Sequence, residues 1–417
     1  MEVNASERLK MQCRFCGREL NRIFVSLGAS PLSNSYLKRE QLNQKEPVYP
    51  LDVYVCEGCF LVQLPEFESP ENIFGDYAYF SSFSDTWLEH TKKYTGKMIS
   101  EFGLNKDSSV IEIASNDGCL LENFILRGIR VLGIEPARNV AEAARKKGVP
   151  TETAFFGTDT ANRLVARGMR ADLLLGNNVL AHVPDINDFV QGLSVLLKPG
   201  GVITMEFPHL MKLIDENQFD TIYHEHFSYF SLLVAEKIFL KHGLELFDVE
   251  ELPTHGGSLR IYAQHRNGPS RDISTRLAQL RQKESRAGYA DIGFYSAFKD
   301  KVLGLRRDIM DFMDDLRRQG RTIVGYGAPA KGNTLLNYCG ISTDFIAYTV
   351  DKSPHKQGLF LPGSHIPIES PEKIRETQPD YLLILPWNIK DEIMKQVSFI
   401  RQWGGKFVTF TPTIEVR

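Results

Sequence analysis

Hydrophobic and polar positions divide the chain into three blocks. In residues 1–75 the apolar runs are short and are separated by Pro, Asn and Ser. Residues 76–265 alternate apolar runs with amphipathic segments such as 139–148, whereas residues 270–318 are charged and helical in period. A second alternating region ends the chain. Three domains are therefore predicted, over residues 1–75, 76–265 and 266–417, the last beginning with a helical connector.

Short apolar runs rich in Val, Ile and Leu are typical of buried parallel strands. Four such runs in the central block lie at residues 108–115, 130–137, 171–178 and 200–207. Four more in the last block lie at residues 321–328, 344–351, 380–387 and 406–412. Strands that alternate with helices predict doubly wound sheets, so we expect an α/β protein with two such sheets behind a small N-terminal module.

Composition and charge restrict the partners. The chain is 42% hydrophobic and 24% charged, with a formal net charge of −3. Such a balance offers no electrostatic footprint for nucleic acid or an anionic membrane, and no apolar run approaches the ~20 residues of a membrane helix. The polar start of the chain predicts no signal peptide. We expect a cytoplasmic protein that is monomeric, since no heptad run indicates obligate assembly.

Four of the six cysteines form two CxxC pairs, Cys13 with Cys16 and Cys56 with Cys59, separated by 39 residues. A glycine follows the first pair and another lies inside the second, where it would permit the tight turn around a metal. Four thiolates suit tetrahedral Zn²⁺ and leave no open position, so a structural zinc site is predicted. Unligated or redox-active thiols are the alternative. A zinc module for nucleic acid is disfavoured because the residues between the two pairs are not enriched in Lys and Arg.

A cofactor site is predicted where the first central strand ends. That strand runs into a polar turn that contains Glu112, Ala114, Asn116 and Gly118. Ligands of doubly wound sheets bind outside the carboxyl ends of the strands. Glu112 could order the turn or accept from a cationic amino group. The small residues Ala114 and Gly118 would let the backbone approach a ligand closely.

The next strand ends carry further polar side chains. Glu135 is placed to accept both ribose hydroxyls of a nucleoside, and Asn177 with Asn178 suits the amino acid part of a cofactor. Together with the preceding turn, this pattern resembles that of class I S-adenosylmethionine-dependent methyltransferases, although the usual three glycines are reduced to one. A plain α/β turn is the alternative. A dinucleotide is disfavoured here because G-x-G-x-x-G is missing.

The least ordinary segment is YHEHFSYF, with Tyr223, His224, Glu225 and His226. In an extended conformation, Tyr223 and Glu225 would share one face and the two histidines the other, whereas a turn would bring the four together differently. Histidine suits a base that removes a proton beside a ketone, since its reference pKa lies near neutrality. Tyrosine hydroxyls and a second histidine suit hydrogen-bond donors to the enolate oxygen.

Other residues compete for the same roles. His182 follows the Asn177–Asn178 strand end, and Tyr77 lies at the start of the central block. The residues themselves do not choose the base among His226, His224 and His182. A zinc-dependent hydrolase built on the HEH sequence, or a purely structural histidine pair, stays open.

The chain resembles a family of sugar C-methyltransferases. The two CxxC pairs, EIASNDG, YHEHFSYFS and the later GYGAPAKGNTLLNY occur in this order in that family, and the resemblance spans essentially all 417 residues. It implies a zinc-binding N-terminal domain, a central S-adenosylmethionine domain and a C-terminal domain of Rossmann type. It also implies a dTDP-linked 4-keto-deoxysugar substrate that is methylated beside the ketone, commonly at C3.

The resemblance also implies residue roles. His226 would be the base that removes the C3 proton, with Tyr223 and Glu225 orienting it or binding sugar substituents. Tyr77 and His182 would line the same pocket. C5 flanks the ketone as well, and the chemistry would serve it equally.

The C-terminal block supports a rival function. Gly325-x-Gly327-x-x-Ala330 follows a predicted strand, and Asp351 lies 21 residues further on, which fits a dinucleotide site. An NAD(P)-dependent nucleotide-sugar oxidoreductase or dehydratase is therefore the main alternative. In the methyltransferase interpretation Lys331 and His355 are candidates for the substrate diphosphate, with His224 as a further substrate contact.

Overall fold

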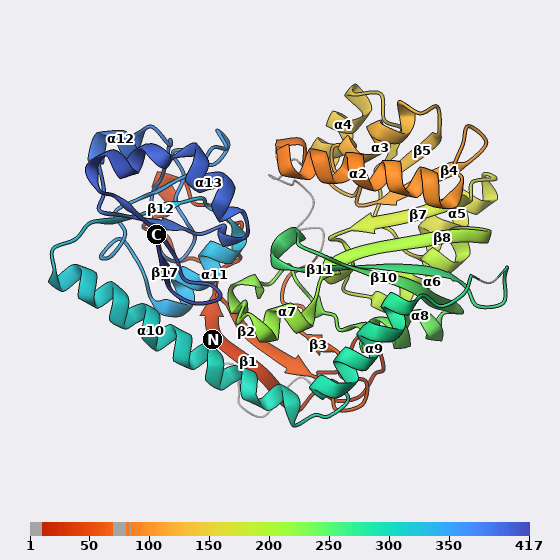
Figure 1. The fold of residues 1–417 in the computed structure, drawn as a ribbon, viewed down its shortest axis with the longest axis horizontal. Helices are drawn as coiled ribbons and strands as arrows, with labels where there is room; N and C mark the ends of the chain where they lie inside the picture. The colour runs from red at the N-terminus through yellow and green to blue at the C-terminus, as the bar shows by residue number, and fades with distance from the viewer. Residues whose placement is uncertain (1–10, 70–80, 84, 270) are drawn as a thin grey trace.

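The computed structural model describes residues 11–69, 81–83, 85–269 and 271–417. Within these residues the chain forms three sheets, and the two larger ones stand side by side as separate lobes (Figure 1). The N-terminal strands lie low between the two lobes, and the long helix α10 (Phe298–Arg318) runs below the C-terminal lobe toward them. No helix among the described residues has the length and apolar character to cross a membrane.

The N-terminal sheet has the order β1-β2-β3-β9 and is antiparallel throughout. Its strands are β1 (Arg22–Ser30), β2 (Tyr49–Val55), β3 (Val62–Gln63) and β9 (Ser228–Tyr229). The inward side chains Leu51, Val53 and Val55 alternate along β2, as a half-buried strand requires. The fourth strand comes from the central block, directly after the YHEH residues. The N-terminal sheet is therefore completed by the segment that carries the candidate base.

The central sheet has the order β10-β11-β8-β7-β4-β5-β6. Its strands are β4 (Ser109–Ile113), β5 (Arg130–Ile134), β6 (Thr151–Glu152), β7 (Ala171–Asn177), β8 (Leu197–Pro208), β10 (Leu244–Leu252) and β11 (Ser258–His265). Only β11 runs antiparallel to its neighbours. All four strands predicted for this block are present. The chain reverses its winding between the neighbours β4 and β7, and doubly wound sheets bind ligands at such a point.

Helices cover both faces of this sheet, which is why β7 and β8 are apolar on both sides. They are α2 (Asp85–Phe102), α3 (Cys119–Ile125), α4 (Arg138–Lys146), α5 (Thr158–Ala166), α6 (Ile186–Leu196), α7 (Leu210–Asp215) and α8 (Leu232–Lys241). Short 3-10 turns η3 (Leu180–His182) and η4 (Phe219–Thr221) follow β7 and α7. The turn η3 ends at His182, and η4 directly precedes the segment that contains His224 and His226.

The predicted helical connector consists of α9 (Thr275–Ala287) and α10. Buried side chains recur along α10 at Val302, Leu305 and Ile309, the three-to-four spacing of an amphipathic helix. The C-terminal sheet follows, with the order β14-β13-β12-β15-β16-β17. Its elements are β12 (Ile323–Tyr326), α11 (Ala330–Cys339), β13 (Thr349–Val350), β14 (Ile368–Glu369), α12 (Lys373–Thr377), β15 (Tyr381–Ile384), α13 (Lys390–Gln396), β16 (Lys406–Thr409) and β17 (Glu415–Val416).

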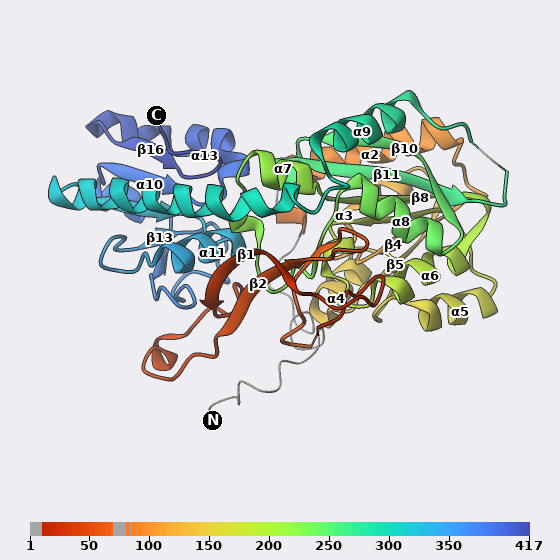
Figure 2. The same ribbon diagram turned by 90° about the horizontal axis from the view of Figure 1, so that it is seen from below.

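The N-terminal module belongs to two cores at once. The apolar side chains around its cysteines pack into the central core, whereas its strands share a core with α10 and the C-terminal sheet. The ring of Phe24 on β1 stacks on Phe298 of α10 at 4.7 Å between centroids. Figure 2, seen from below, shows the module lying across the junction of the two lobes. It therefore joins the lobes to each other.

Candidate active site and zinc centre

The four paired cysteines meet in one cluster. The Sγ atoms of Cys13, Cys16, Cys56 and Cys59 all lie within 4.8 Å of one another, and the two closest pairs are 3.5 Å apart. Thiolates about 2.3 Å from a tetrahedral zinc would be about 3.8 Å apart. The cluster therefore fits one zinc ion with four protein ligands, as predicted from the spacing.

Each cysteine pair is closed by a left-handed residue after its second cysteine. Gly17 has φ +75°, and its N–H donates to the Cys13 carbonyl at 2.9 Å. The equivalent residue in the second pair is Phe60, with φ +70° and a 2.9 Å bond to the Cys56 carbonyl. The expectation that the intervening Gly58 provides the second turn was wrong. Gly58 has no positive φ, and a Cβ there would lie 2.8 Å from the Arg18 side chain.

The turn after β4 has the conformation that its small residues suggest. Ala114, Asn116 and Gly118 have φ values of +55°, +49° and +78°. A Cβ on Gly118 would lie 2.8 Å from the Val149 side chain, so packing within the protein already requires glycine there. The alternating left-handed residues fold the turn against the end of β4 and aim α3 away from it.

Three buried carboxylates surround this turn. Glu135 accepts the N–H groups of Asn116 at 2.8 Å and Ala137 at 2.9 Å, and burial raises its pKa. Burial also raises the pKa of Glu112, with the nearby charges of Glu135 and Asp117 adding to it. The Oε2 atom of Glu112 is buried and has no hydrogen-bond partner in the protein. A buried carboxylate in that state is a natural partner for a cationic ligand group.

The end of β7 adds further unpaired polar atoms. Both amide atoms of Asn177, and Oδ1 of Asn178, are buried without a protein partner. Glu112 pairs with Leu175 in the parallel β4–β7 ladder, so the two asparagines follow on the same sheet edge as Glu112. These atoms at the switch point fit the polar amino acid part of S-adenosylmethionine. Glu135, whose carboxylate oxygens have lone pairs left, fits its ribose.

His226 is held with one ring nitrogen protonated. Its Nδ1–H donates to the Thr221 carbonyl at 2.8 Å, and since a carbonyl only accepts, this bond places the proton on Nδ1. Its Nε2 then accepts from the Tyr223 hydroxyl at 2.8 Å. Burial, reinforced by the neighbouring His182, lowers the pKa of His226 well below its usual value. The ring is therefore neutral at physiological pH, with a basic Nε2.

A tight turn produces this arrangement. The N–H of His226 donates to the Tyr223 carbonyl at 2.9 Å, which brings these two side chains to one side. His224 instead contacts the N-terminal module, where its ring packs against Tyr49 and its Nε2 donates to the Pro50 carbonyl at 3.2 Å. The extended pairing of the two histidines is thus replaced by the turn. His224 and His226 lie in different surroundings.

His182 shares the pocket of His226. The two ring centroids are 4.7 Å apart, and His182 Nδ1–H donates to the Glu225 carbonyl at 2.8 Å. Burial lowers the pKa of His182 to about 4. The Glu225 carboxylate accepts from Asn34 at 2.7 Å, and burial raises its pKa to about 7. Asn34 had no distinguishing signal in the sequence.

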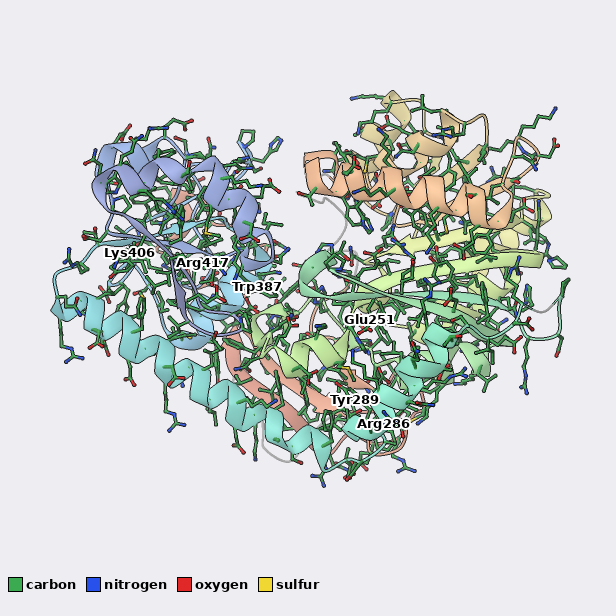
Figure 3. The ribbon with its side chains drawn as sticks, viewed as in Figure 1. Glu251, Arg286, Tyr289, Trp387, Lys406 and Arg417 are labelled. Carbon is green, nitrogen blue, oxygen red and sulfur yellow. The ribbon has the colours of Figure 1, made fainter. Side chains whose placement is uncertain are left out.

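The C-terminal lobe contributes Lys331. Its Nζ donates to Asn388 Oδ1 at 2.8 Å and lies 4.5 Å from the centroid of the Trp387 ring. Burial lowers the pKa of Lys331 to about 8, while the charge of Asp220 opposes this effect. The Trp387 indole donates to Asp220 at 2.6 Å, and Figure 3 labels Trp387 on the side of its lobe that faces the central lobe. His355 is exposed on the segment after β13.

His255 is a site residue that sequence reasoning missed. It has φ +53°, and its Nε2 accepts from the Asn178 amide at 2.8 Å. Burial lowers its pKa to about 4, and the charge of Lys331 acts in the same direction. The following Gly256 and Gly257 also have positive φ, so the adjacent glycines were the available signal.

Arg260, on the same segment, is no anion contact. Its guanidinium is buried and is paired with Glu206 at 2.9 Å and Glu250 at 3.0 Å. Residues 253–257 are therefore a connection between β10 and β11, and Arg260 lies within β11.

The Gly-rich loop of the C-terminal lobe is occupied by protein groups. The Ala328 N–H donates to Asp351 at 2.8 Å, whereas its carbonyl accepts from Tyr36 at 2.6 Å and Lys356 at 2.9 Å. In a dinucleotide site the loop N–H groups would face a diphosphate and the acid a ribose. Here the Ala328 N–H bonds to the acid itself, and the Ala328 carbonyl joins the loop to Tyr36 of the N-terminal module. Tyr77 lies outside the described residues.

Strand order, the turn after β4 and the polar switch-point edge together define a class I S-adenosylmethionine-dependent methyltransferase. Three family profiles match the chain. They are described as "Putative zinc binding domain" over residues 13–74, "Methyltransferase domain" over residues 87–249 and "C-methyltransferase C-terminal domain" over residues 253–412.

Relatives agree with this class. The chain is 37% identical over 401 residues to C-methyltransferase NovU of Streptomyces niveus, which covers 96% of this chain and 95% of that protein. It is 34% identical over 98 residues to a ubiquinone biosynthesis O-methyltransferase of Methylobacterium sp. (strain 4-46), covering 22% of this chain and 38% of that one. The chain belongs to the C-methyltransferase family. It is an S-adenosylmethionine-dependent C-methyltransferase with a four-cysteine zinc centre.

Among solved structures, similarity is found to magnesium protoporphyrin IX methyltransferase from Synechocystis PCC 6803 with bound S-adenosylhomocysteine. The identity is 15% and the TM-score 0.35, over 46% of this chain and 91% of that one. A second is an S-adenosylmethionine-dependent methyltransferase from Clostridium acetobutylicum ATCC 824, with 12% identity and a TM-score of 0.34, over 43% and 92% of the two chains.

Proposed function

We propose that the enzyme methylates a dTDP-linked 4-keto-deoxysugar at the carbon beside the ketone, most simply C3, in the biosynthesis of a branched deoxysugar. The observation that carries this proposal is the neutral His226, whose unprotonated Nε2 can accept a proton and whose ring packs against His182. Methylation of carbon requires a base at this point, because the C–H bond beside a ketone must first be broken. The near-full-length likeness to a C-methyltransferase supports it.

The proposed reaction starts with proton removal. Nε2 of His226 takes the proton from the substrate carbon, the C–H electron pair forms the enolate, and negative charge builds on the ketone oxygen. The Nδ1–H bond to the Thr221 carbonyl stabilises the imidazolium that results. S-adenosylmethionine supplies an electrophilic methyl group when bound. Methyl transfer to the enolate carbon yields S-adenosylhomocysteine and the branched keto-sugar, and His226 returns its proton to solvent.

Groups around His226 are suited to the charge of the enolate. The Tyr223 hydroxyl is 2.8 Å from Nε2 and turns its hydrogen bond to the substrate ketone oxygen as the substrate binds, which frees the Nε2 lone pair to take the proton. The ammonium of Lys331 is largely desolvated, so its attraction for an anionic oxygen or the substrate diphosphate is stronger than in water. We assign Lys331 to the substrate, and Glu225 with its Asn34 partner to a sugar substituent. His224 and His355 stay predictions as substrate contacts.

Proton abstraction can be measured apart from methyl transfer. The enzyme is incubated in D₂O with S-adenosylhomocysteine and a dTDP-4-keto-6-deoxysugar, and deuterium entry at C3 and C5 is followed by NMR. We expect enzyme-dependent exchange at C3, with a rate that falls by about 10²-fold or more in His226→Asn. When S-adenosylmethionine replaces S-adenosylhomocysteine, we expect a product about 14 mass units heavier than the substrate, since one methyl group replaces one hydrogen. Exchange at C5 alone would indicate that C5, rather than C3, is the methylated carbon. Wild-type exchange by His226→Asn would remove the residue from the base role.

The rival oxidoreductase is tested by calorimetry. Titration with S-adenosylhomocysteine should give micromolar binding, whereas NAD should give none. Tight binding of NAD without binding of S-adenosylhomocysteine would move the chemistry to the loop at Gly325.

A further inference from the structure

Gln63 links the zinc ligands to the strand pair beside the base. Its Nε2 donates to the Cys13 sulfur at 3.1 Å, and its Oε1 accepts the Arg14 N–H at 2.9 Å. The side chain is 1% exposed, so these bonds are shielded from water. In β3, Gln63 pairs directly with Ser228 of β9, two residues after His226. Gln63 thus contacts a metal ligand and also pairs with the strand that follows the turn of residues 223–226, which we call the catalytic turn.

Arg14 makes a second link from the same cysteine pair. Its guanidinium donates to the Pro184 carbonyl at 2.7 Å and to the Leu64 carbonyl, and lies 5.3 Å from the centroid of the Phe227 ring. Pro184 follows His182 by two positions, and Phe227 directly follows His226. One side chain therefore spans both histidine-bearing segments.

Backbone bonds complete the link. The Leu64 N–H donates to the Phe227 carbonyl at 3.0 Å, and the Phe227 N–H donates to the Ala181 carbonyl at 2.7 Å. Three segments, one each from β3, η3 and the catalytic turn, are thereby tied together at Phe227. Outer-shell partners of zinc ligands orient those ligands and the groups attached to them. A displacement of about 1 Å in a catalytic group can cost 10²-fold in rate.

We infer that Arg14 and Gln63 are positioning residues through which the zinc centre sets the geometry of the catalytic histidines. The inference rests on the proposed function, because it takes His226 as the base. Zinc holds the Cys13 turn, and this turn aims Arg14 and accepts the bond from the Gln63 side chain. The Arg14 guanidinium and the pairing of Gln63 with Ser228 then hold His182 and His226 at their 4.7 Å separation. The zinc centre then contributes to catalysis without contacting substrate.

The test compares Arg14→Met and Gln63→Leu in the full-length zinc-loaded enzyme. Four quantities are measured: zinc released to a chromogenic chelator, the Kd for S-adenosylhomocysteine, kcat with KM, and C3 deuterium exchange. For Arg14→Met we expect kcat and exchange to fall 10- to 100-fold, with zinc retained and the Kd within twofold. For Gln63→Leu we expect faster zinc release and a similar loss of kcat. Arg14→Lys, with one compact donor group, should recover part of the rate.

Matched controls exist on the far side of the central sheet. Arg271 also donates to a backbone carbonyl, that of Gly200 at 3.0 Å, and lies 5.5 Å from the centroid of the Phe247 ring. Gln264 is also 1% exposed. Arg271→Met and Gln264→Leu should leave kcat, exchange and zinc release within about twofold of wild type. Thermal melts of all variants identify any that are unfolded. If Arg14→Met is unfolded, the comparison is made with Arg14→Lys instead.

Two failures are distinguishable. Wild-type exchange in Arg14→Met and Arg14→Lys, with His226→Asn inactive, overturns the positioning role and leaves the proposed function standing. Wild-type exchange in His226→Asn overturns the proposed function first. An equal loss in the control variants would show a general stability effect and would also contradict the inference.

Discussion

At the scale of single residues, the chemistry of His226 depends on what each ring nitrogen meets. The Thr221 carbonyl determines which nitrogen carries the proton, and burial determines that the ring stays neutral. Both effects come from groups that lie within five residues along the chain or surround the pocket. The same pocket lowers the pKa of His182 to about 4. Two neutral imidazoles can therefore stand side by side without charge repulsion.

A pH profile tests this state. The proposed base acts in its neutral form, so we expect activity to be lost as pH falls through the pKa of His226. Because that pKa lies well below 6.5, the part of the kcat/KM loss that comes from His226 should appear only in solution more acidic than about pH 6.5. Lys331 and Glu225, with pKa values of about 8 and about 7, change charge above that pH, so the profile is also measured in Glu225→Gln. An acidic limb centred at 6.5 or above that persists in Glu225→Gln would contradict the lowered pKa of His226. The same pH profile measured for Arg271→Met shows how much activity is lost through unfolding in acidic solution.

Glu112 supports a prediction about the cofactor. Its unpaired Oε2 suits the cationic amino group of S-adenosylmethionine, and a charged hydrogen bond contributes about 1.5–3 kcal/mol. Glu112→Gln should therefore raise the Kd for S-adenosylhomocysteine by about 10- to 100-fold in calorimetry. Glu142→Gln, an exposed change on α4, should leave the Kd unchanged. Equal affinity in both variants would remove Glu112 from the site.

At the scale of elements, the N-terminal sheet depends on contributions from distant parts of the chain. β3 has two residues and pairs with β9 on one side and β2 on the other. So short a strand has little stability of its own. The zinc centre next to it supplies the constraint that a small apolar core cannot. Folding of this sheet and formation of the catalytic turn are thereby coupled.

Removal of one ligand tests the coupling of zinc to stability. Cys16→Ser leaves three thiolates, so bound zinc should fall below one per chain by atomic absorption and the melting temperature should drop by several degrees. Cys339 is buried outside the cluster, and Cys339→Ala should retain a full equivalent of zinc. Full zinc content in Cys16→Ser would contradict the four-ligand assignment.

At the scale of the whole molecule, the lobes meet around the pocket. The indole of Trp387 donates to Asp220, and Gly256 lies so close that a Cβ there would come within 2.3 Å of the Trp387 ring. Thr334 of the C-terminal lobe donates to the Ile222 carbonyl at 2.9 Å, beside the catalytic turn. The position of Lys331 relative to His226 is set by these contacts.

Gly256→Ala should disturb this junction. Its φ of +90° is strained for alanine, and the methyl group would push the Trp387 ring away. We expect the free energy of unfolding measured in urea to fall by roughly 1–3 kcal/mol. We also expect kcat to be reduced. Gly304→Ala on α10 meets nothing within 4 Å and should be neutral or stabilising. Unchanged stability in Gly256→Ala would contradict the close contact.

Local sequence patterns determined much of this protein. The paired cysteines, the strand periodicity and the turn after β4 are short-range features, because ligand spacing, side-chain alternation and left-handed conformations are decided within a few residues. They predicted the zinc cluster, the two doubly wound sheets and the sheet edge to which we assign the cofactor. The histidine segment was singled out as well, but not which of its histidines has the basic nitrogen.

Tertiary structure decided the rest. His224 and His226 are separated by a turn whose bonds reach the Pro50 and Thr221 carbonyls, and neither partner is marked in the sequence. Asn34 and His255 come from distant parts of the chain, and the fold brings them against Glu225 and Asn178. Hydrogen bonds to backbone groups and burial depend on the folded surroundings rather than on residue type. The sequence by itself therefore determined which chemistry is available, and only the fold decided which atom performs it.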